Sequence, residues 1–357
     1  MTGGKQKSRQ DDGALKVVSI GGGTGLSTLL RGLKHFVIPA GSHVQESELH
    51  SSALKPAIAD LTAVVTVTDD GGSSGKLRKE FNILPPGDIR NCIVALSEDE
   101  ALLSRLFKYR FPAQSGLAGH NFGNLFLTAL TAITGDFAEA VRLSAGVLVS
   151  RGHIYPATTA NCELEAQMDD GTRVRGETSI TASKRRIRQL TMIPGDVKPM
   201  PQTLDAIRHA DLITIGPGSL FTSLIPNVLV RGIPEAIAKS DAIKVFVCNL
   251  MTQANESLGL SAADHIRAIY EHAGLEVFDY ALINVKPASA DMQAKYALEG
   301  ASQIVIQPET IEALGVRPIF GDFLIEDRGV ARHDTDRVAQ ELLQLAVNQG
   351  VGATVHS

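Results

Sequence analysis

The sequence predicts an α/β protein with a mostly parallel sheet and a small β-hairpin insertion. Stretches of β-branched and other apolar residues, typical of buried strands, alternate with stretches of helical period along most of the chain. Three of the strand stretches lead into glycine-rich turns, at 21–25, 71–75 and 216–219. Between 151 and 200, polar and apolar residues alternate instead, which is typical of antiparallel strands with one exposed face.

The first strand and turn, residues 17–25, have the pattern of a nucleotide- or phosphate-binding unit. The β-branched residues Val17, Val18 and Ile20 predict a buried strand. Four of the five residues in 21–25 are glycine, so the backbone can adopt positive φ and approach a ligand closely. Leucines at helical spacing then predict a helix as far as Phe36, whose N-terminus suits a phosphate. The Lys-Ser or Lys-Thr pair of a P-loop does not follow, and a tight turn without a ligand is the alternative.

A second buried strand is predicted at 63–68, and it leads into Asp69, Asp70 and the Gly-Gly-Ser-Ser-Gly stretch 71–75. Ligands of an open parallel sheet bind beyond the carboxyl ends of its strands, so we expect this loop and the first glycine turn on the same rim. The two carboxylates are suited to a ribose hydroxyl, a substrate hydroxyl or a divalent metal such as Mg²⁺. An Asp-Gly turn with solvated carboxylates is the alternative.

Asp88 is predicted to be the N-cap of a helix over 89–96, because an apolar stripe follows it. Arg90 and Asn91 lie in the first turn, where the helix dipole disfavours a cation. A cation at this place indicates an anionic partner, either a phosphate or a nearby aspartate.

His120, Asn121 and Asn124 cluster at the start of another apolar helix, predicted to end near 133. A histidine next to two asparagines can act as an acid, a base or a hydrogen-bond donor. The alternative is that it has only a structural role.

The insertion is predicted over 151–200. Strands at 163–168 and 172–178 flank the hairpin signal Asp169-Asp170-Gly171. The basic run 184–188 is interpreted as a solvated face of the insertion, with a partner or anion site as the alternative.

The second half of the chain repeats the strand–glycine arrangement. A strand at 211–215 runs into Gly216-Pro217-Gly218-Ser219, where N–H groups and hydroxyls are offered to a phosphate. A strand at 244–250 ends among polar residues that include Asn249 and Thr252. Further predicted elements are helices at 136–143, 203–209, 228–239, 262–273 and 335–348, and strands at 146–150, 281–285 and 303–306. The predicted divisions are a disordered tail at 1–14, two halves of one domain at 15–150 and 201–348, and the insertion between them.

Composition narrows the functional classes. The 357 residues carry a formal net charge of -5, which argues against nucleic acid as a general partner. The three cysteines are scattered without a Cys-x-x-Cys motif, which argues against a disulfide framework and fits a reducing compartment. The polar N-terminus lacks the apolar run of a signal peptide, and the apolar segments are too short to span a bilayer. We therefore expect a cytoplasmic protein without a membrane span.

Taken in order, the motifs resemble those of the bacterial gluconeogenesis factor family, the YvcK-like proteins, which is related to the 2-phospho-L-lactate transferases. The resemblance covers about residues 15–340 and rests on the stretches 21–26, 68–75, 87–96, 119–125, 216–230 and 247–253. It implies a Rossmann-like, doubly wound domain that binds a nucleotide sugar such as UDP-glucose or UDP-N-acetylglucosamine. It also implies a regulatory role in cell shape and wall synthesis during gluconeogenic growth, with proteins of cell-wall synthesis as partners and a homo-oligomeric state. In the related transferases an aspartate at the end of the second strand faces substrate and metal, and Asp69 or Asp70 matches that place.

Two functions follow from these observations, and a scaffold with a vestigial site ranks below both because the predicted site is rich in polar ligands. The first is a regulatory protein that binds a nucleotide sugar, and the alternative is a phosphotransferase that uses a nucleotide-activated donor and Mg²⁺ held by Asp69 or Asp70. The candidate catalytic residues are Asp69, Asp70 and His120. The candidate ligand- and phosphate-binding residues are Gly21, Gly22, Gly23, Thr24, Gly25, Asp69, Asp70, Gly71, Gly72, Ser73, Ser74, Asp88, Arg90, Asn91, His120, Asn121, Asn124, Gly216, Gly218, Ser219, Asn249 and Thr252.

Overall fold

A computed structural model describes residues 14–39, 57–98, 102–148, 150–183, 185–254 and 256–349. Apart from residue 14, the tail predicted at 1–14 lies outside the described residues, as does the segment 40–56 of the loop predicted before the second strand. Within the described ranges, the structure contains no helix long and apolar enough to cross a membrane.

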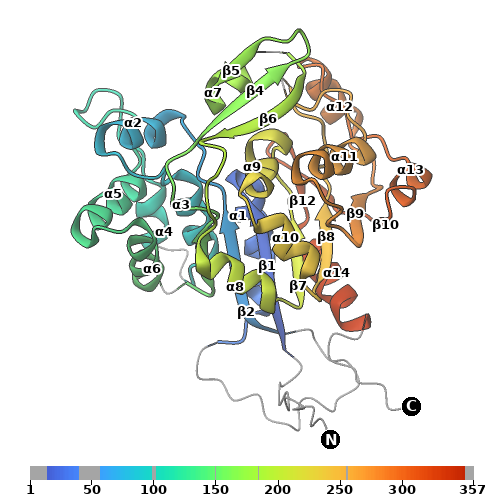
Figure 1. The fold of residues 1–357 in the computed structure, drawn as a ribbon, viewed down its shortest axis with the longest axis horizontal. Helices are drawn as coiled ribbons and strands as arrows, with labels where there is room; N and C mark the ends of the chain where they lie inside the picture. The colour runs from blue at the N-terminus through green and yellow to red at the C-terminus, as the bar shows by residue number, and fades with distance from the viewer. Residues whose placement is uncertain are drawn as a thin grey trace, which may run out of the picture.

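The centre of the fold is a seven-stranded sheet with the order β10-β9-β8-β7-β1-β2-β3, and all of its pairings are parallel (Figure 1). The strands are β1 (Leu15–Gly21), β2 (Ile58–Val65), β3 (His153–Pro156), β7 (Leu212–Ile215), β8 (Ile243–Val247), β9 (Tyr280–Asn284) and β10 (Arg317–Gly321). The chain builds outward from β1 in one direction, and then returns to the other side of β1 with β7. The predicted α/β class is therefore confirmed, and the strand order reverses between β1 and β7, which is where ligands bind in such sheets.

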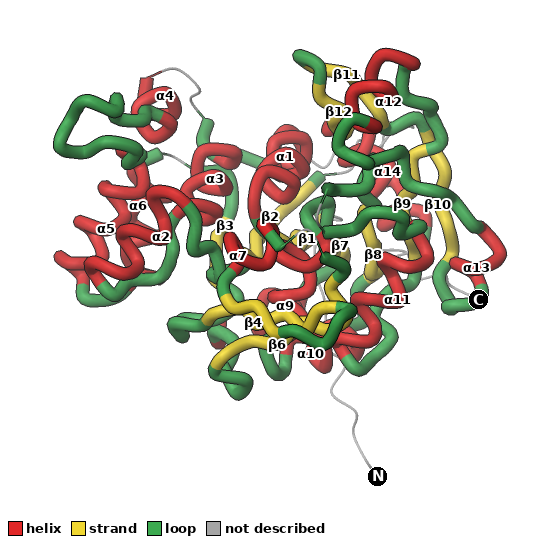
Figure 2. The backbone as a smooth tube through the Cα atoms, turned by 90° about the horizontal axis from the view of Figure 1, so that it is seen from above, coloured by secondary structure: helices red, strands yellow, loops and turns green. Residues whose placement is uncertain are grey.

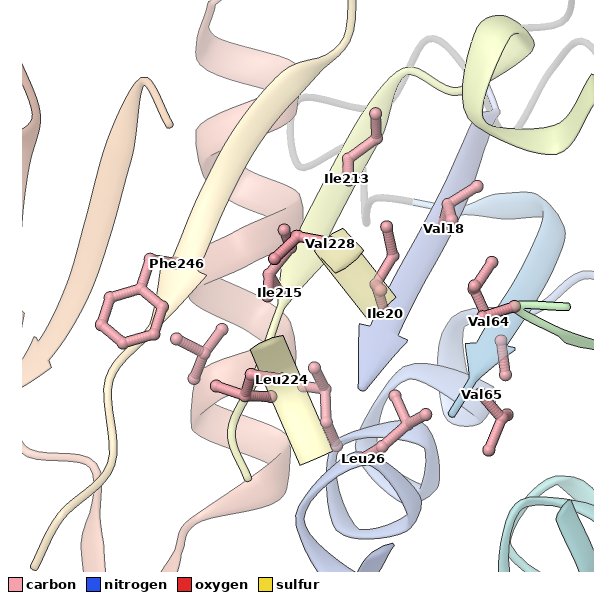
Figure 3. Packing of buried hydrophobic residues seen from close by; sticks show 14 of the residues in the cluster. Val18, Ile20, Leu26, Val64, Val65, Ile213, Ile215, Leu224, Val228 and Phe246 are labelled. Atoms are coloured by element: carbon pink, nitrogen blue, oxygen red, sulfur yellow. The ribbon is translucent and has the colours of Figure 1, made fainter. Parts of the chain in front are cut away.

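Helices cover both faces of this sheet (Figure 2). One face carries α1 (Gly23–Leu33), α3 (Gly87–Leu96) and α14 (Thr335–Asn348), and the other carries α8 (Pro201–His209), α9 (Ile225–Leu229), α10 (Ile233–Lys239) and α11 (Ala262–Ala273). The β-branched strand residues are buried on both sides, as a doubly covered sheet requires. Figure 3 shows this packing around β1, β2 and β7, with Val18, Ile20, Val64, Ile213, Ile215, Leu224 and Val228.

A helical group lies beside α3, formed by α2 (Gly72–Phe81), α4 (Leu102–Lys108), α5 (Phe122–Thr134) and α6 (Phe137–Val147). The predicted β insertion is confirmed as an antiparallel sheet of order β5-β4-β6. Its elements are β4 (Glu163–Met168), β5 (Arg173–Arg175), the short helix α7 (Glu177–Ala182) and β6 (Ile187–Ile193). The insertion packs next to α9 (Figure 1). The division of the chain at 150 and 200 stays a prediction.

Two predicted strands are wrong. Of the stretch 146–150, the described residues 146–148 and 150 form no strand: α6 extends to Val147, with Ala140 and Ser144 on its buried side, and Ser150 makes only an isolated bridge to Ser97. The next strand, β3, starts at His153. Residues 303–306 form only an isolated bridge, from Gln303 to Met251. The edge strand next to β9 is instead β10, for which no strand was predicted.

Some predicted helices also differ. The stretch 228–239 is divided into α9 and α10, because Gly232 has a φ of 99° and cannot continue a helix. The stretch 71–75 is not a flexible loop, since α2 begins at Gly72. The strand predicted at 172–178 is shorter, because it ends at Arg175 and α7 begins at Glu177. Other elements without a predicted counterpart include β6, α4, α12 (Ala290–Ala297), α13 (Pro308–Glu312) and the hairpin of β11 (Leu324–Asp327) and β12 (Val330–His333).

Candidate functional site

A cavity of about 550 Å³ lies beyond the carboxyl ends of the central strands. Both glycine turns, at 22–25 and 217–219, contribute to its wall, as the topology predicted. The predicted site residues that line it are Gly22, Gly23, Thr24, Gly25, Asp69, Asp88, Gly218, Ser219, Asn249 and Thr252.

The two glycine turns meet backbone to backbone. A Cβ on Gly25 would lie 2.2 Å from the carbonyl oxygen of Pro217 and 2.9 Å from Cα of Gly218, so no larger residue fits there without moving the second turn. The side-chain amide of Asn227 donates to the carbonyl oxygen of Gly21 over 3.1 Å and ties α9 to the end of β1. The N-cap residue of α1, Gly22, has no side chain to accept from the helix, so the N–H groups of Thr24 and Gly25 in its first turn remain available for an anion.

Side chains from the tip of β8 hold the second turn. Asn249 Oδ1 accepts from Gly218 N over 3.0 Å, and Asn249 Nδ2 donates to Gly218 O over 2.8 Å. Gln253 Nε2 donates to Ser219 Oγ over 3.0 Å, and the buried Glu256 accepts from Thr222 N over 2.9 Å. The predicted ligand residue Asn249 therefore shapes the turn as well as lining the cavity.

Three carboxylates, of Asp69, Asp88 and Glu177, line the cavity and lie close enough to influence one another, and we call this part of the cavity its acidic end. Burial, followed by the negative charge of Asp69, raises the pKa of Asp88 to about 6. Burial and the neighbouring carboxylates, Asp69 first among them, raise the pKa of Glu177 to about 9. Mutual repulsion of this kind is relieved by a divalent cation.

Asp88 is not the N-cap predicted for it. Helix α3 begins at Gly87, with Pro86 in the N-cap position, so Asp88 lies inside the first turn. Its carboxylate instead accepts a hydrogen bond from Gly23 N, in the first glycine turn. This contact joins two residues that are far apart in the sequence. Rules for helix caps consider only neighbouring residues, so they could not predict the orientation of Asp88.

Asp88→Asn is expected to stabilise the free protein at neutral pH. The pKa of Asp88 in the folded state lies above its usual value of 3.8, so wild-type stability falls as the pH rises from about 4 to about 6 and stays lowered above that. An asparagine avoids this loss, and a shift of about two pH units corresponds to about 2–3 kcal/mol at pH 7. Urea unfolding of both proteins between pH 4 and 8 measures the difference. The same change at the exposed Asp196 is the control, and equal pH profiles for wild type and Asp88→Asn would contradict the expectation.

The structure describes no group of three or more His, Cys, Asp or Glu side chains arranged to hold a metal ion within the described ranges. Mg²⁺ commonly binds through one or two carboxylates together with the phosphate oxygens of a substrate. The residues at the acidic end fit that kind of site, in which the ligand completes the coordination.

Asp70 faces away from the cavity, unlike its neighbour. Asp69 Oδ1 accepts from Gly71 N over 2.9 Å, and Asp69 lines the cavity. Asp70 Oδ1 accepts from both the backbone N and Oγ1 of Thr178, in the insertion. Of the two aspartates predicted as metal ligands, only Asp69 is therefore directed to the site.

Several predicted site residues gather between α2, α3 and α5 rather than on the cavity wall. Ser73 Oγ lies 3.2 Å from His120 Nδ1, and Asn124 Nδ2 donates to Ser74 Oγ over 3.5 Å. Asn121 is the N-cap of α5. These hydrogen bonds link the start of α2, which follows Asp69 in the chain, to the start of α5.

Arg90 and Asn91 are bonded to one another, through Nη2 and Oδ1 at 2.7 Å. Burial, followed by the charge of Arg110, lowers the pKa of Arg90, whereas Asp88 and Asp69 raise it. Nearby aspartates are thus one source of the anionic partner that the sequence indicated. The remaining predicted glycines shape turns at the ends of β1, β2 and β7, namely Gly21, Gly71, Gly72 and Gly216.

The opposite wall of the cavity was not predicted from the sequence. Tyr296 of α12 and Val330, Ala331, Arg332 and His333 of β12 form that wall. Arg332 is the only lysine or arginine among the described residues that line the cavity. Asp327-Arg328-Gly329 is a turn signal that could have revealed the hairpin, but no local pattern says that it folds back over the glycine turns.

Comparisons with known proteins agree on one group. Residues 17–324 match the family model described as 2-phospho-L-lactate transferase CofD. A gluconeogenesis factor from Halalkalibacterium halodurans is 46% identical over 328 residues, 92% of this chain and 95% of that protein. The gluconeogenesis factor of Bacillus subtilis is 44% identical over 92% of this chain and 98% of its own length. A crystal structure of a Bacillus halodurans protein, 46% identical, superimposes with a TM-score of 0.85 over 92% of this chain and 99% of that one.

Proposed function

Because this chain belongs to the 2-phospho-L-lactate transferase CofD family and closely resembles its gluconeogenesis factors, we propose that it is a regulatory protein that binds a nucleotide sugar. The resemblance inferred from the motifs is confirmed by these matches. The ligand that we propose is of the UDP-glucose or UDP-N-acetylglucosamine class, and the site is the cavity between the glycine turns and β12.

The main support is the meeting of two glycine turns opposite a single arginine. The first turn offers the backbone N–H groups of Thr24 and Gly25, the second offers N–H and Oγ of Ser219, and Arg332 supplies positive charge to the same cavity. A diphosphate needs donors on more than one side and a charge to offset its own. A nucleotide that carries a diphosphate therefore matches this part of the cavity better than an uncharged ligand does.

Two parts of the cavity wall differ in chemistry. One part of the wall contains Leu250, Met251 and Tyr296, which pack together, and Val330, and these suit the flat, partly apolar face of a nucleobase. The acidic end carries the carboxylates of Asp69, Asp88 and Glu177. Carboxylates accept hydrogen bonds from sugar hydroxyls and can share a Mg²⁺ with the diphosphate, so we place the sugar at this end.

Such a site can act as a sensor. A ligand that contacts both the glycine turns and β12 stabilises the conformation in which β12 lies against the cavity, relative to one in which β12 has moved away. The surface offered to proteins of cell-wall synthesis would then depend on the nucleotide-sugar level, which matches a role in cell shape during gluconeogenic growth.

The alternative is a phosphotransferase, and the acidic end of the cavity favours it. An acceptor hydroxyl would attack a phosphorus of the nucleotide-activated donor, forming a new P–O bond while the bond to the departing nucleoside monophosphate breaks. Asp88, with a pKa of about 6, is suited to take the hydroxyl proton.

Thermal unfolding with UDP-glucose and UDP-N-acetylglucosamine, each with and without Mg²⁺, tests the proposal. A ligand at 100 times its Kd is expected to stabilise the folded protein by about 2.7 kcal/mol. Mg²⁺ alone is expected to give no shift, because the described residues hold no preformed metal group. No shift with either UDP-sugar would contradict the proposal, and release of a nucleoside monophosphate from a donor and an acceptor alcohol would favour the transferase.

A further inference from the structure

Helix α7 carries Glu177 to the acidic end of the cavity, yet the helix has no cap of its own. Its N-cap residue is Gly176, which has no side chain to accept hydrogen bonds from the first N–H groups of the helix. The helix has only six residues, so an unsatisfied first turn would weaken it substantially.

Asp70 supplies the missing cap from 108 positions away in the sequence. Asp70 Oδ1 accepts from Thr178 N over 2.8 Å and from Thr178 Oγ1 over 2.6 Å. A carboxylate that accepts from the second N–H of a helix makes the bond that an N-cap residue normally makes. The bond therefore fixes α7 directly to the loop that also carries Asp69.

Gly176 is shaped for this contact. Its φ is 90°, and a Cβ there would lie 2.5 Å from Asp70 Oδ2. A side chain at 176 would therefore push Asp70 away, whereas glycine lets the carboxylate reach Thr178.

Other bonds hold the rest of the insertion in place. Arg78 of α2 donates from Nε to Asn161 Oδ1 over 2.8 Å, beside β4. His272 of α11 accepts at Nε2 from Leu190 N of β6 over 2.9 Å. Because these bonds do not involve α7, loss of the bond from Asp70 is expected to loosen the first turn of α7, which Ile180 still anchors in the core, while the sheet of the insertion stays attached.

We propose that Asp70 is a positioning residue that caps α7 through Thr178 and thereby holds Glu177 in the acidic end of the cavity. Adjacent aspartates thus have separate tasks: Asp69 faces the ligand, and Asp70 controls how many carboxylates the ligand meets. This inference rests on the proposed function for the use of Glu177, but the capping itself does not depend on it.

The first test needs no ligand. Hydrogen–deuterium exchange of the free protein is expected to become at least about 10-fold faster across 177–182 in Asp70→Asn and in Thr178→Val, while Thr178→Ser retains wild-type protection. Thr172→Val is the matched control, because Thr172 makes the same pair of bonds to Asp170 in the hairpin turn of the insertion. Unchanged exchange across α7 in Asp70→Asn would overturn the proposal.

The second test asks whether Asp70 acts through Glu177. The Kd for UDP-N-acetylglucosamine is measured without and with Mg²⁺, and the ratio of the first value to the second is expected to fall about 5- to 10-fold in Asp70→Asn and in Glu177→Gln, with no further fall in the double variant. If Asp70→Asn lowers this ratio as much in the Glu177→Gln background as in the wild type, Asp70 contacts the cation itself, and the proposal is overturned. If the wild type binds neither UDP-sugar, the proposed function fails, and the exchange measurement still decides the role of Asp70.

Discussion

Gly25→Ala is expected to abolish nucleotide-sugar binding, with a Kd at least about 100-fold higher. The added methyl group would meet the backbone of Pro217 and Gly218 at distances of 2.2–2.9 Å, and backbone atoms in a turn cannot rotate away as the end of a side chain can. The two glycine turns must therefore separate, which moves the donors on both sides of the diphosphate. A 100-fold loss of affinity corresponds to about 2.7 kcal/mol.

Isothermal titration with UDP-N-acetylglucosamine measures this loss. The unfolding free energy is expected to fall as well, by about 1–3 kcal/mol, as is usual when atoms are forced into a packed site. Gly146→Ala is the control, because Gly146 lies in α6 with no atom within 4 Å of the added methyl. Binding by Gly25→Ala at wild-type affinity would show that the junction of the turns is not the ligand site.

Arg332→Ala is expected to raise the Kd for a UDP-sugar by about 10- to 150-fold, with little effect on folding. A hydrogen bond to a charged group contributes about 1.5–3 kcal/mol, and Arg332 is the only cation among the described residues that line the cavity. Arg332→Lys keeps the charge but loses the planar fork, so an intermediate affinity is expected.

The matched control lies on the same hairpin. The side chain of Arg328 is 93% exposed and is paired with Asp327, which also pairs with Arg332, but Arg328 does not line the cavity. Arg328→Ala is therefore expected to bind the UDP-sugar as the wild type does. If both variants lose affinity equally, the effect comes from the general positive charge of the hairpin and not from the cavity.

Local patterns in the sequence were sufficient for the fold class and for the part of the cavity wall that the glycine turns form. The apolar runs around Val18 and Ile213 are long enough to indicate strands buried on both faces, and the glycines after them mark turns at the carboxyl ends of those strands. Local patterns failed where a short apolar stretch fits both a strand and a helix. At 146–147, for example, a strand was predicted but the residues belong to the end of α6.

The sequence by itself determined that this protein has strand–glycine–helix units whose turns share one rim of a parallel sheet, because strand burial, glycine conformation and helix period are set within a few residues. Only the tertiary structure decided that Asp69 faces the cavity while Asp70 caps α7, that Asp88 bonds to Gly23, and that Arg332 closes the opposite wall. Each of these depends on a partner far away in the chain, and the direction of a side chain in a loop is set by the packing of such partners rather than by its neighbours in sequence.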